Sequence, residues 1–175
     1  KAAYGVKTTE RILEDFLTER PITVRCRTHK ASLREIVTSL KSQGVTVEQA
    51  PYLPYALKIS DYNHILTLET FLQGKILVQD VSSMLVAEAA SPKKGDHIID
   101  MCAAPGGKSI HAADKMGDYG NVDARDVSQY KADLIEENIH RTGVINVEAR
   151  VQDATVYDPD SEQAADIVIA DVPCS

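Results

Sequence analysis

The sequence has no tryptophan and only two phenylalanines and three cysteines among its 175 residues. With so few aromatic side chains, it offers no evident stacking platform for single-stranded nucleic acid. The cysteines are odd in number and widely spaced, which argues against a disulfide framework and favours a reducing, cytoplasmic compartment. No apolar run approaches the ~20 residues that a membrane-spanning helix needs, so we expect no membrane partner. Because an initiator Met and the apolar core of a signal peptide are both missing, we expect the chain to begin inside a longer protein.

Several site patterns are also missing. The five histidines form no His-x-x-x-His pair, and the cysteines form no Cys-x-x-Cys pair, so we expect no metal site. Neither the Gly-x-Gly-x-x-Gly pattern of dinucleotide-binding folds nor the Gly-x-x-x-x-Gly-Lys phosphate loop occurs. The glycine spacing therefore argues against a nicotinamide dehydrogenase and against a phosphate-loop enzyme.

Charge is unevenly distributed along the chain. The net charge is −7, yet residues 1–44 carry nine Lys and Arg against five Asp and Glu, while residues 45–175 carry an excess of eleven acids. A polyanion such as RNA needs only a local basic patch, so Arg25, Arg27, Lys30 and Arg34 are candidates for phosphate contacts. A solvated surface explains the same charges, and both interpretations stay open.

The first part of the chain predicts a lead-in helix and a small α+β unit. An apolar stripe favours a helix over residues 7–20, which Pro21 would end. This lead-in, residues 1–20, would come from a preceding domain or linker. The α+β unit, residues 21–75, would contain a helix at 32–41 and strands at 22–28, 45–47 and 56–59.

The second part, residues 76–175, predicts a parallel sheet. A strand at 75–79 and a helix at 81–90 would open it. Strands and helices then alternate, which favours parallel pairing through right-handed crossovers and hence a doubly wound, Rossmann-like α/β sheet. Such a sheet usually has more strands than the chain supplies, so we expect a truncated domain. The further strands are expected at 98–101, 121–124, 146–151 and 166–170, and the helices at 108–116 and 129–142.

The most informative stretch is residues 100–108, which read Asp-Met-Cys-Ala-Ala-Pro-Gly-Gly-Lys directly after a predicted strand. An acid that closes a strand, followed by small residues and paired glycines, favours a loop that approaches a cofactor closely. Three further acids, Asp126, Asp153 and Asp171, follow the next strands. Because the carboxyl ends of parallel strands meet at one edge of the sheet, we expect these acids and Asp100 to converge there.

Three segments together resemble a known family. They are residues 100–108, the Asp-Val-Pro-Cys-Ser stretch at 171–175 and the Val-Gln-Asp-Val-Ser-Ser stretch at 78–83. They resemble the bacterial ribosomal RNA cytosine-5 methyltransferases, the Sun (Fmu) branch of the NOL1/NOP2/sun family. The resemblance implies the class I methyltransferase sheet, a preceding RNA-recognition-like unit, S-adenosyl-L-methionine as cofactor and RNA, in particular small-subunit ribosomal RNA, as substrate.

The resemblance also implies roles for single residues. Asp126 would hold the ribose hydroxyls, Asp153 the adenine edge, and Asp171 would face both the cofactor and the target base. At residues 25–28 the chain reads Arg-Cys-Arg-Thr where the family usually shows Arg-x-Asn-Thr, so RNA contacts there do not carry over. The residues that would line the methionine and ribose side of the cofactor are Cys102, Ala103, Ala104, Pro105, Gly106, Gly107 and Lys108.

Methylation at carbon 5 of cytosine needs a thiolate that first adds to carbon 6 and makes the ring an enamine. A carboxyl group such as that of Asp171 could favour this addition through a hydrogen bond to the ring nitrogen. In the family that the chain resembles, the nucleophile belongs to a Thr-Cys motif, which these 175 residues lack. Cys174, in a Pro-Cys pair, would be a helper thiol for product release, and we expect this chain alone to be inactive.

Two alternatives remain from the sequence. In DNA cytosine-5 enzymes a Pro-Cys cysteine is itself the nucleophile, so that role stays open for Cys174. The missing Thr-Cys segment also leaves open a non-catalytic fragment that binds the cofactor or RNA. The sequence leaves the oligomeric state and the target nucleotide undetermined.

Overall fold

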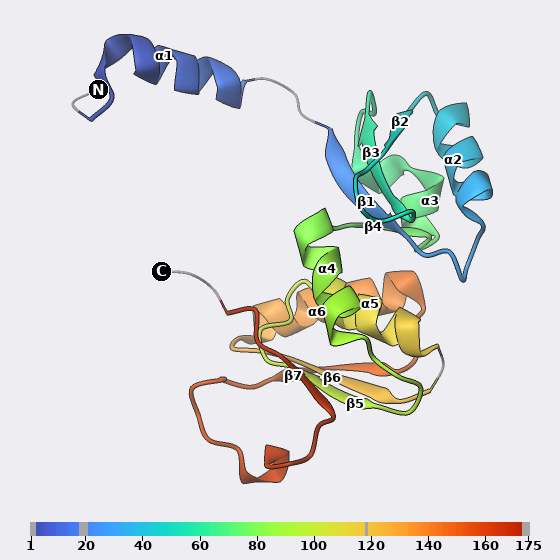
Figure 1. Ribbon diagram of the computed structural model, residues 1–175, viewed down its shortest axis with the longest axis vertical. Coiled ribbons are helices and arrows are strands. Elements are labelled where there is room, and N and C mark those ends of the chain that lie inside the picture. The colour runs from blue at the N-terminus through green and yellow to red at the C-terminus, as the bar shows by residue number, and fades with distance from the viewer. Residues whose placement is uncertain (1–2, 18–20, 118, 173–175) are drawn as a thin grey trace.

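The computed structural model describes residues 3–17, 21–117 and 119–172, which form two sheets and the helices around them (Figure 1). The N-terminal part contains α1 (Gly5–Phe16), β1 (Ile22–Cys26), α2 (Leu33–Ser42), β2 (Thr46–Gln49), β3 (Ala56–Ser60), the 3-10 helix η1 (Ile65–Thr67), α3 (Glu69–Leu72) and β4 (Ile76–Val78). The C-terminal part contains α4 (Val81–Ala90), β5 (His97–Asp100), α5 (Gly107–Met116), β6 (Asn121–Asp126), α6 (Gln129–Thr142), β7 (Val147–Val151), the 3-10 helix η2 (Pro159–Ser161) and β8 (Ile167–Ile169).

The two sheets differ in strand direction. The first has the order β2-β3-β1-β4, and its paired strands are antiparallel. The second has the order β7-β6-β5-β8, and its paired strands are parallel. The predicted fold class, a Rossmann-like parallel sheet preceded by a small α+β unit, is therefore confirmed.

The strand predicted over residues 75–79 is present as β4, but it joins the first sheet rather than the second. It pairs with β1, so that Ile76 lies opposite Cys26 and Val78 opposite Val24. The expectation that this strand opens the second unit was wrong. The reason is that β1 pairs with β3 along one edge only, and β4 satisfies the backbone groups of its other edge. The chain passes to the second unit after Val78.

Alternation along β1 divides the first unit into an apolar and a charged face. Val24 and Cys26 are buried in a core with Ile36 and Leu40 of α2, as the alternating sequence predicts. Arg25 points to the opposite face of the sheet and is buried there. The first sheet therefore presents charge toward the second unit.

Buried ion pairs join the two units. Arg25 and Arg27 are each only 2% exposed, and both donate to the carboxylate of Asp114 on α5, at 2.6 Å in each case. Lys30 donates to the carbonyl of Thr142 at the end of α6. Arg25 and Arg27 were two of the four candidates for contacts with RNA phosphates. For these two the hypothesis was wrong, because their guanidinium groups are enclosed by protein. Arg34 is exposed.

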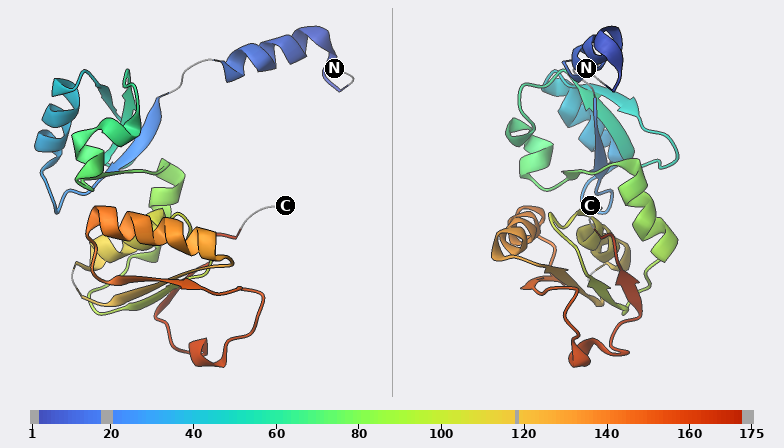
Figure 2. Two further views of the ribbon diagram at one scale, coloured as in Figure 1. Left: turned by 180° about the vertical axis from the view of Figure 1, so that it is seen from behind. Right: turned by 90° about the vertical axis from the view of Figure 1, so that its left-hand side faces the viewer.

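The helices of the second unit lie between its sheet and the first unit. Figures 1 and 2 show α4, α5 and α6 on this one face. The core there combines side chains of α5 and α6 with those of the strands, and it contains Ala112, Ala113, Met116, Ile135, Ile98, Val122 and Ala124. Among the described residues, the other face carries the connection from β7 to β8, with η2, and no α-helix.

Helix α1 stands apart from both sheets (Figure 1). It spans Gly5–Phe16 rather than the predicted residues 7–20, of which 18–20 lie outside the described part. Its apolar stripe is exposed, with Phe16 81% and Leu13 59% accessible. No helix among the described residues is long and apolar enough to cross a membrane.

Candidate functional site

The loop between β5 and α5 carries most of the predicted cofactor residues. It leaves the carboxyl end of β5 at Asp100 and enters α5 at Gly107. In the sheet, β5 lies between β6 and β8, so the chain order changes direction at this strand. In open α/β sheets, ligands bind at such a switch point, outside the carboxyl ends of the strands. The loop therefore lies where this fold favours a ligand.

Backbone hydrogen bonds tie the loop to both neighbouring strands. The amide of Met101 donates to the carbonyl of Ile169 on β8 at 2.9 Å, and the amide of Ala103 donates to the carbonyl of Arg125 on β6 at 2.8 Å. The loop is therefore held on both sides, by β6 and by β8, before any ligand binds.

Asp126 ends β6 and is buried beside this loop, with 3% of its surface exposed. Its Oδ2 accepts the amide of Ala104 at 3.0 Å, and its Oδ1 accepts the amide of Val127 at 2.8 Å and lies 2.9 Å from the ammonium of Lys131. Burial raises the pKa of Asp126, but the hydrogen bonds from Lys131, Val127 and Ala104 outweigh burial, so the pKa lies below its ordinary value. The side chain is therefore an ionised acceptor.

Asp171 follows β8 and reaches the start of α5. Its carboxylate lies 2.5 Å from the ammonium of Lys108, the second residue of α5. The carboxylate is 55% exposed, so it is open to an incoming ligand. The Asp171–Lys108 pair therefore flanks the loop on the side of β8, whereas Asp126 flanks it on the side of β6.

Asp100 behaves differently from the other acids. It is fully buried and accepts a hydrogen bond of 2.6 Å from the hydroxyl of Ser109. Burial raises the pKa of Asp100, and the hydrogen bond from Ser109 offsets only part of this rise. Asp100 thus lies at the same edge of the sheet as Asp126 and Asp171, as expected, but its carboxylate is enclosed by protein and contacts Ser109.

Cys102 is half-buried within the loop. Burial raises the pKa of its thiol, and the negative charges of Asp126, Asp100 and Asp171 raise it further. Three of the four predicted acids thus lie close enough to act on one thiol. A thiol in this surrounding stays protonated at neutral pH and is a poor nucleophile.

Asp153 follows the end of β7 and lies on the face of the sheet that carries the connection from β7 to β8. It is exposed, and its Oδ1 accepts the amide of Thr155 at 2.9 Å and the hydroxyl of Thr155 at 2.7 Å. It shares a hollow of about 290 Å³ with Met101 of the loop and with the apolar side chains of Ile99 and Val168. Asp153 therefore borders the loop through Met101, but its carboxylate is engaged in its own turn.

The remaining residues of the loop differ in exposure. Ala103 and Gly106 are buried, Ala104, Gly107 and Lys108 are half-buried, and Pro105 is exposed. Gly106 has a φ of +97°, and a Cβ atom there would stand 3.3 Å from Cγ2 of Ile135 on α6. Glycine is thus required for both the backbone angle and the close approach. Cys174 lies outside the described residues.

Sequence reasoning missed the side chains that support the loop from elsewhere. Lys131 on α6 pairs with Asp126, and Asn138 donates to the carbonyl of Pro105 at 3.0 Å. Gln79 packs against Gly107. The position of Lys131 in the first turn of the helix after Asp126 was a usable signal, whereas the other two contacts join segments far apart in the chain.

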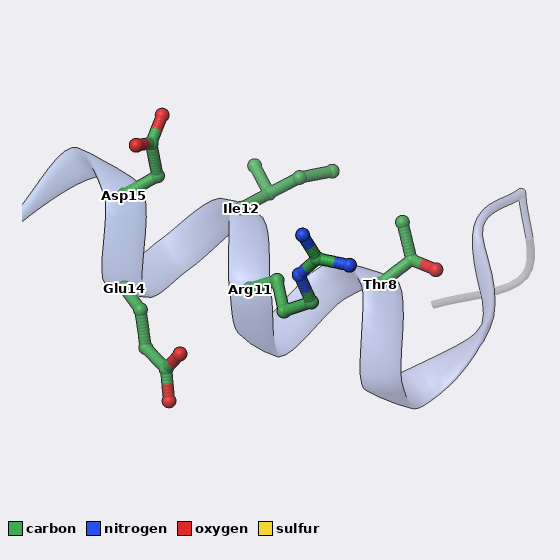
Figure 3. Close-up of a pocket in the computed structure, with 5 residues that line it drawn as sticks. All are labelled: Thr8, Arg11, Ile12, Glu14 and Asp15. Carbon is green, nitrogen blue, oxygen red and sulfur yellow. The ribbon is translucent and has the colours of Figure 1, made fainter.

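A second hollow lies on α1 and carries no comparable chemistry. Figure 3 shows its lining residues, which project from successive turns of this one helix. Among the described residues no other element lines this hollow, so it lacks the convergent walls of a ligand site. The lining residues are Thr8, Arg11, Ile12, Glu14 and Asp15.

Comparison with known proteins matches both halves of the chain. A family model described as 16S rRNA methyltransferase RsmB/F matches residues 87–175. A second model, described as an RsmF/B-like ferredoxin-like domain, matches residues 1–65.

Individual relatives agree with these matches. A probable ribosomal RNA small subunit methyltransferase B of Bacillus subtilis is 34% identical over 174 residues, which cover 99% of this chain and 39% of the relative. A tRNA (cytosine(72)-C(5))-methyltransferase of Pyrococcus horikoshii is 41% identical over 108 residues, which cover 62% of this chain and 28% of the relative. The solved structure of a methyltransferase homolog protein from Pyrococcus horikoshii has a TM-score of 0.70 at 31% identity and covers 82% of this chain and 48% of that one. The chain thus spans less than half the length of each of these three proteins.

Proposed function

The chain belongs to the RsmB/F family of 16S rRNA methyltransferases, and from this premise we propose that its parent protein methylates carbon 5 of a cytosine in RNA. The proposed methyl donor is S-adenosyl-L-methionine, and the proposed substrate is small-subunit ribosomal RNA. The name of the Bacillus subtilis relative supports the substrate, and the name of the Pyrococcus relative supports carbon 5 of cytosine. A non-catalytic fragment is not favoured, since these relatives are named as enzymes.

One observation carries the proposal: the loop at the switch point is flanked by Asp126 on one side and by the Asp171–Lys108 pair on the other. Asp126 is buried and ionised, and Oδ2 accepts only one hydrogen bond among the described residues. A carboxylate oxygen has two lone pairs, so this atom can accept one more donor. A ribose hydroxyl is a suitable donor, so the residues present fit the nucleoside part of the cofactor.

We propose that residues 102–108 line the methionine and ribose side of the cofactor. Asp126 would accept from the ribose hydroxyls, and Asp153 would meet the adenine edge after its turn with Thr155 opens. When bound, S-adenosyl-L-methionine supplies a methyl group whose carbon is electron-poor, and therefore open to attack, because it is bonded to a sulfonium sulfur.

Asp171 is proposed to act on both ligands. In its protonated form, the exposed carboxyl group of Asp171 can donate a hydrogen bond to the ring nitrogen of cytosine and favour addition of a thiolate at carbon 6, and Lys108 holds the side chain in place. Cys174, three residues further on, is proposed as the helper thiol for product release. The proposed nucleophile is the thiol of a Thr-Cys motif, which does not occur in these 175 residues.

The proposal extends to the organisation and location of the parent protein. We propose a lead-in at residues 1–20, a small α+β unit that includes β4 and therefore ends at Val78, and a methyltransferase unit that follows. The odd number and wide spacing of the three cysteines support the cytoplasm as the proposed compartment.

The test is methyl transfer by the full-length protein to unmodified small-subunit ribosomal RNA, read out as 5-methylcytosine. Asp126→Asn should weaken binding of S-adenosylhomocysteine about 10- to 100-fold, because a hydrogen bond to a charged acceptor is lost. Asp171→Asn should lower kcat about 100-fold at saturating cofactor.

Asp133→Asn is the matched control, since Asp133 is an exposed carboxylate on α6 that bonds only Gln129 among the described residues. It should change neither quantity. Methylation at a base other than cytosine, or full activity of Asp126→Asn, would overturn the proposal.

A further inference from the structure

Two neighbouring arginines of the first unit make nearly the same contacts with the second unit. Arg25 and Arg27 are equally buried, and each places a guanidinium nitrogen 2.6 Å from the carboxylate of Asp114. Arg27 also donates to the carbonyls of Gly74 and Thr142. Arg25 lacks these carbonyl partners among the described residues and instead donates to Gln79, which Arg27 does not contact there.

Gln79 connects Arg25 to the start of α5. The Nε of Arg25 donates to Oε1 of Gln79 at 2.8 Å, and Gln79 is only 6% exposed. A Cβ atom at Gly107 would stand 3.8 Å from Cδ of Gln79, which is van der Waals contact. The carboxamide of Gln79 therefore backs the first residue of α5, directly after the loop of residues 102–106.

Arg25 is consequently linked to both ends of α5, directly at one end and through Gln79 at the other. It reaches Asp114 near the C-terminal end and, through Gln79, Gly107 at the N-terminal end. These two helix positions are seven residues apart, which corresponds to about 10 Å along the axis. A short α-helix moves as a rigid body, so a shift of Arg25 is transmitted to the loop.

We propose that Arg25 is a positioning residue for the cofactor loop. Through Gln79 and Asp114 it holds the opening turn of α5 at a set place relative to the first sheet. The docking of the first unit and the affinity for the cofactor are thereby coupled. This inference rests on the proposed function, since it takes the loop of residues 102–108 as the cofactor site.

If Arg25 only stabilised the fold, replacing it would have the same effect as replacing Arg27. Arg27 therefore provides the comparison. Arg27 has the same burial, the same carboxylate partner and two further carbonyl partners, but no contact with Gln79 among the described residues. Replacing either arginine should lower stability, whereas only the replacement of Arg25 should disturb the loop.

The experiment measures the Kd of S-adenosylhomocysteine by calorimetry, together with Tm, for the full-length protein. Arg25→Lys keeps the charge but cannot bridge Asp114 and Gln79, and Gln79→Leu removes the acceptor with little change in volume. Each should raise Kd about 3- to 30-fold, which is the range seen when coupling residues are changed. Gln79→Glu keeps an acceptor for Arg25 and should restore Kd to within about two-fold of the wild type.

Arg27→Lys is the matched control. It should lower Tm as much as Arg25→Lys does and leave Kd within about two-fold of the wild type. If Arg25→Lys proves too unstable to titrate, the Gln79→Leu and Gln79→Glu pair still decides the question. Unchanged Kd in Gln79→Leu, or an equal rise of Kd in Arg27→Lys, would overturn the inference. Absence of binding by the wild type would instead overturn the proposed function, and this inference with it.

Discussion

His111 lies on α5 and packs edge-on against Tyr55 of the first unit, with ring centroids 5.5 Å apart. It is 3% exposed. Burial lowers the pKa of His111 to about 3, and the nearby positive charge of Arg25 contributes to this. The imidazole is therefore neutral at neutral pH and acts as an aromatic contact between the units rather than as an acid or base.

This burial predicts a pH-dependent stability. Between the ordinary pKa of 6.5 and the folded value of about 3, the unfolded state binds a proton that the folded state does not. The contribution of the neutral His111 to the free energy of unfolding is fully present above pH 6.5. It is lost as pH falls toward 3, by up to about 1.4 kcal/mol per pH unit. His111→Phe keeps the ring and removes the titration.

Urea unfolding of both proteins from neutral pH to about pH 4 measures the effect. The free energy of unfolding of the wild type should fall relative to that of His111→Phe as the solution becomes more acidic. Other titrating groups, such as Asp100, are common to both proteins and cancel in the difference. Parallel curves for the two proteins would contradict a buried neutral imidazole.

Neither described cysteine is a thiolate. Burial raises the pKa of Cys26 to about 12, and burial together with nearby carboxylates raises the pKa of Cys102. A thiol needs a pKa near or below ambient pH to act as a nucleophile. Both residues are therefore unsuited to attack carbon 6 of cytosine, in agreement with the proposal that the nucleophile belongs to a Thr-Cys motif.

Among the secondary-structure elements, the turn before β4 packs directly against the end of α6. Gly74, in this turn, is buried with a φ of +63°. A Cβ atom there would stand 2.5 Å from the carbonyl oxygen of Arg141 and 2.6 Å from Cα of Thr142. Both are backbone atoms of α6, so no side chain can rotate to make room.

Gly74→Ala should therefore destabilise the protein by at least about 3 kcal/mol, from left-handed strain of about 1–2 kcal/mol plus overpacking. Gly44 is the matched control, because its φ is +82° and a Cβ atom there meets nothing within 4 Å. Gly44→Ala should cost only about 1 kcal/mol, since strain is its single penalty. Chemical unfolding of the two variants gives the comparison, and equal losses would show that α6 is not packed against this turn.

For the whole molecule, buried ion pairs join the two units beside an apolar cluster, in which Met84 of α4 packs with Ala50, Leu53 and Ala56. The side chain of Asp114 is 7% exposed and lies between the guanidinium groups of Arg25 and Arg27. Burial raises the pKa of Asp114, but the two arginines outweigh it, so the pKa lies below its ordinary value. Arg141 adds a hydrogen bond of 2.8 Å to the carbonyl of Phe71 and stacks on its ring at 3.9 Å.

Asp114→Ala should lower the free energy of unfolding by about 3–5 kcal/mol, because two buried cations lose their counter-charge. The triple variant Arg25→Met/Arg27→Met/Asp114→Leu should recover most of that loss, since apolar groups of similar volume need no counter-charge. Urea unfolding measures both. A loss below about 1 kcal/mol for Asp114→Ala would mean that the arginines find solvent or other partners once the carboxylate is gone.

The sequence by itself determined the order and type of the elements and the place of the loop. The helices Val81–Ala90 and Gln129–Thr142 were predicted with these bounds, and for the first of them Pro92 and Gly95 are local signals that end a helix. The alternation of strands and helices likewise predicted the parallel sheet. The roles of Asp126, Asp171 and residues 102–108 remain predictions that rest on resemblance and on their position in the fold.

Only the tertiary structure decided which side chains meet across the two units. It assigned β4 to the first sheet, enclosed Asp100 beneath the loop, and placed Arg25 and Arg27 on Asp114, 89 and 87 residues away. A strand that alternates apolar and charged residues has the same sequence pattern whether its charged face contacts water or a second unit. Which of the two occurs depends on the docking of one sheet against distant helices, and local sequence carries no signal for that contact.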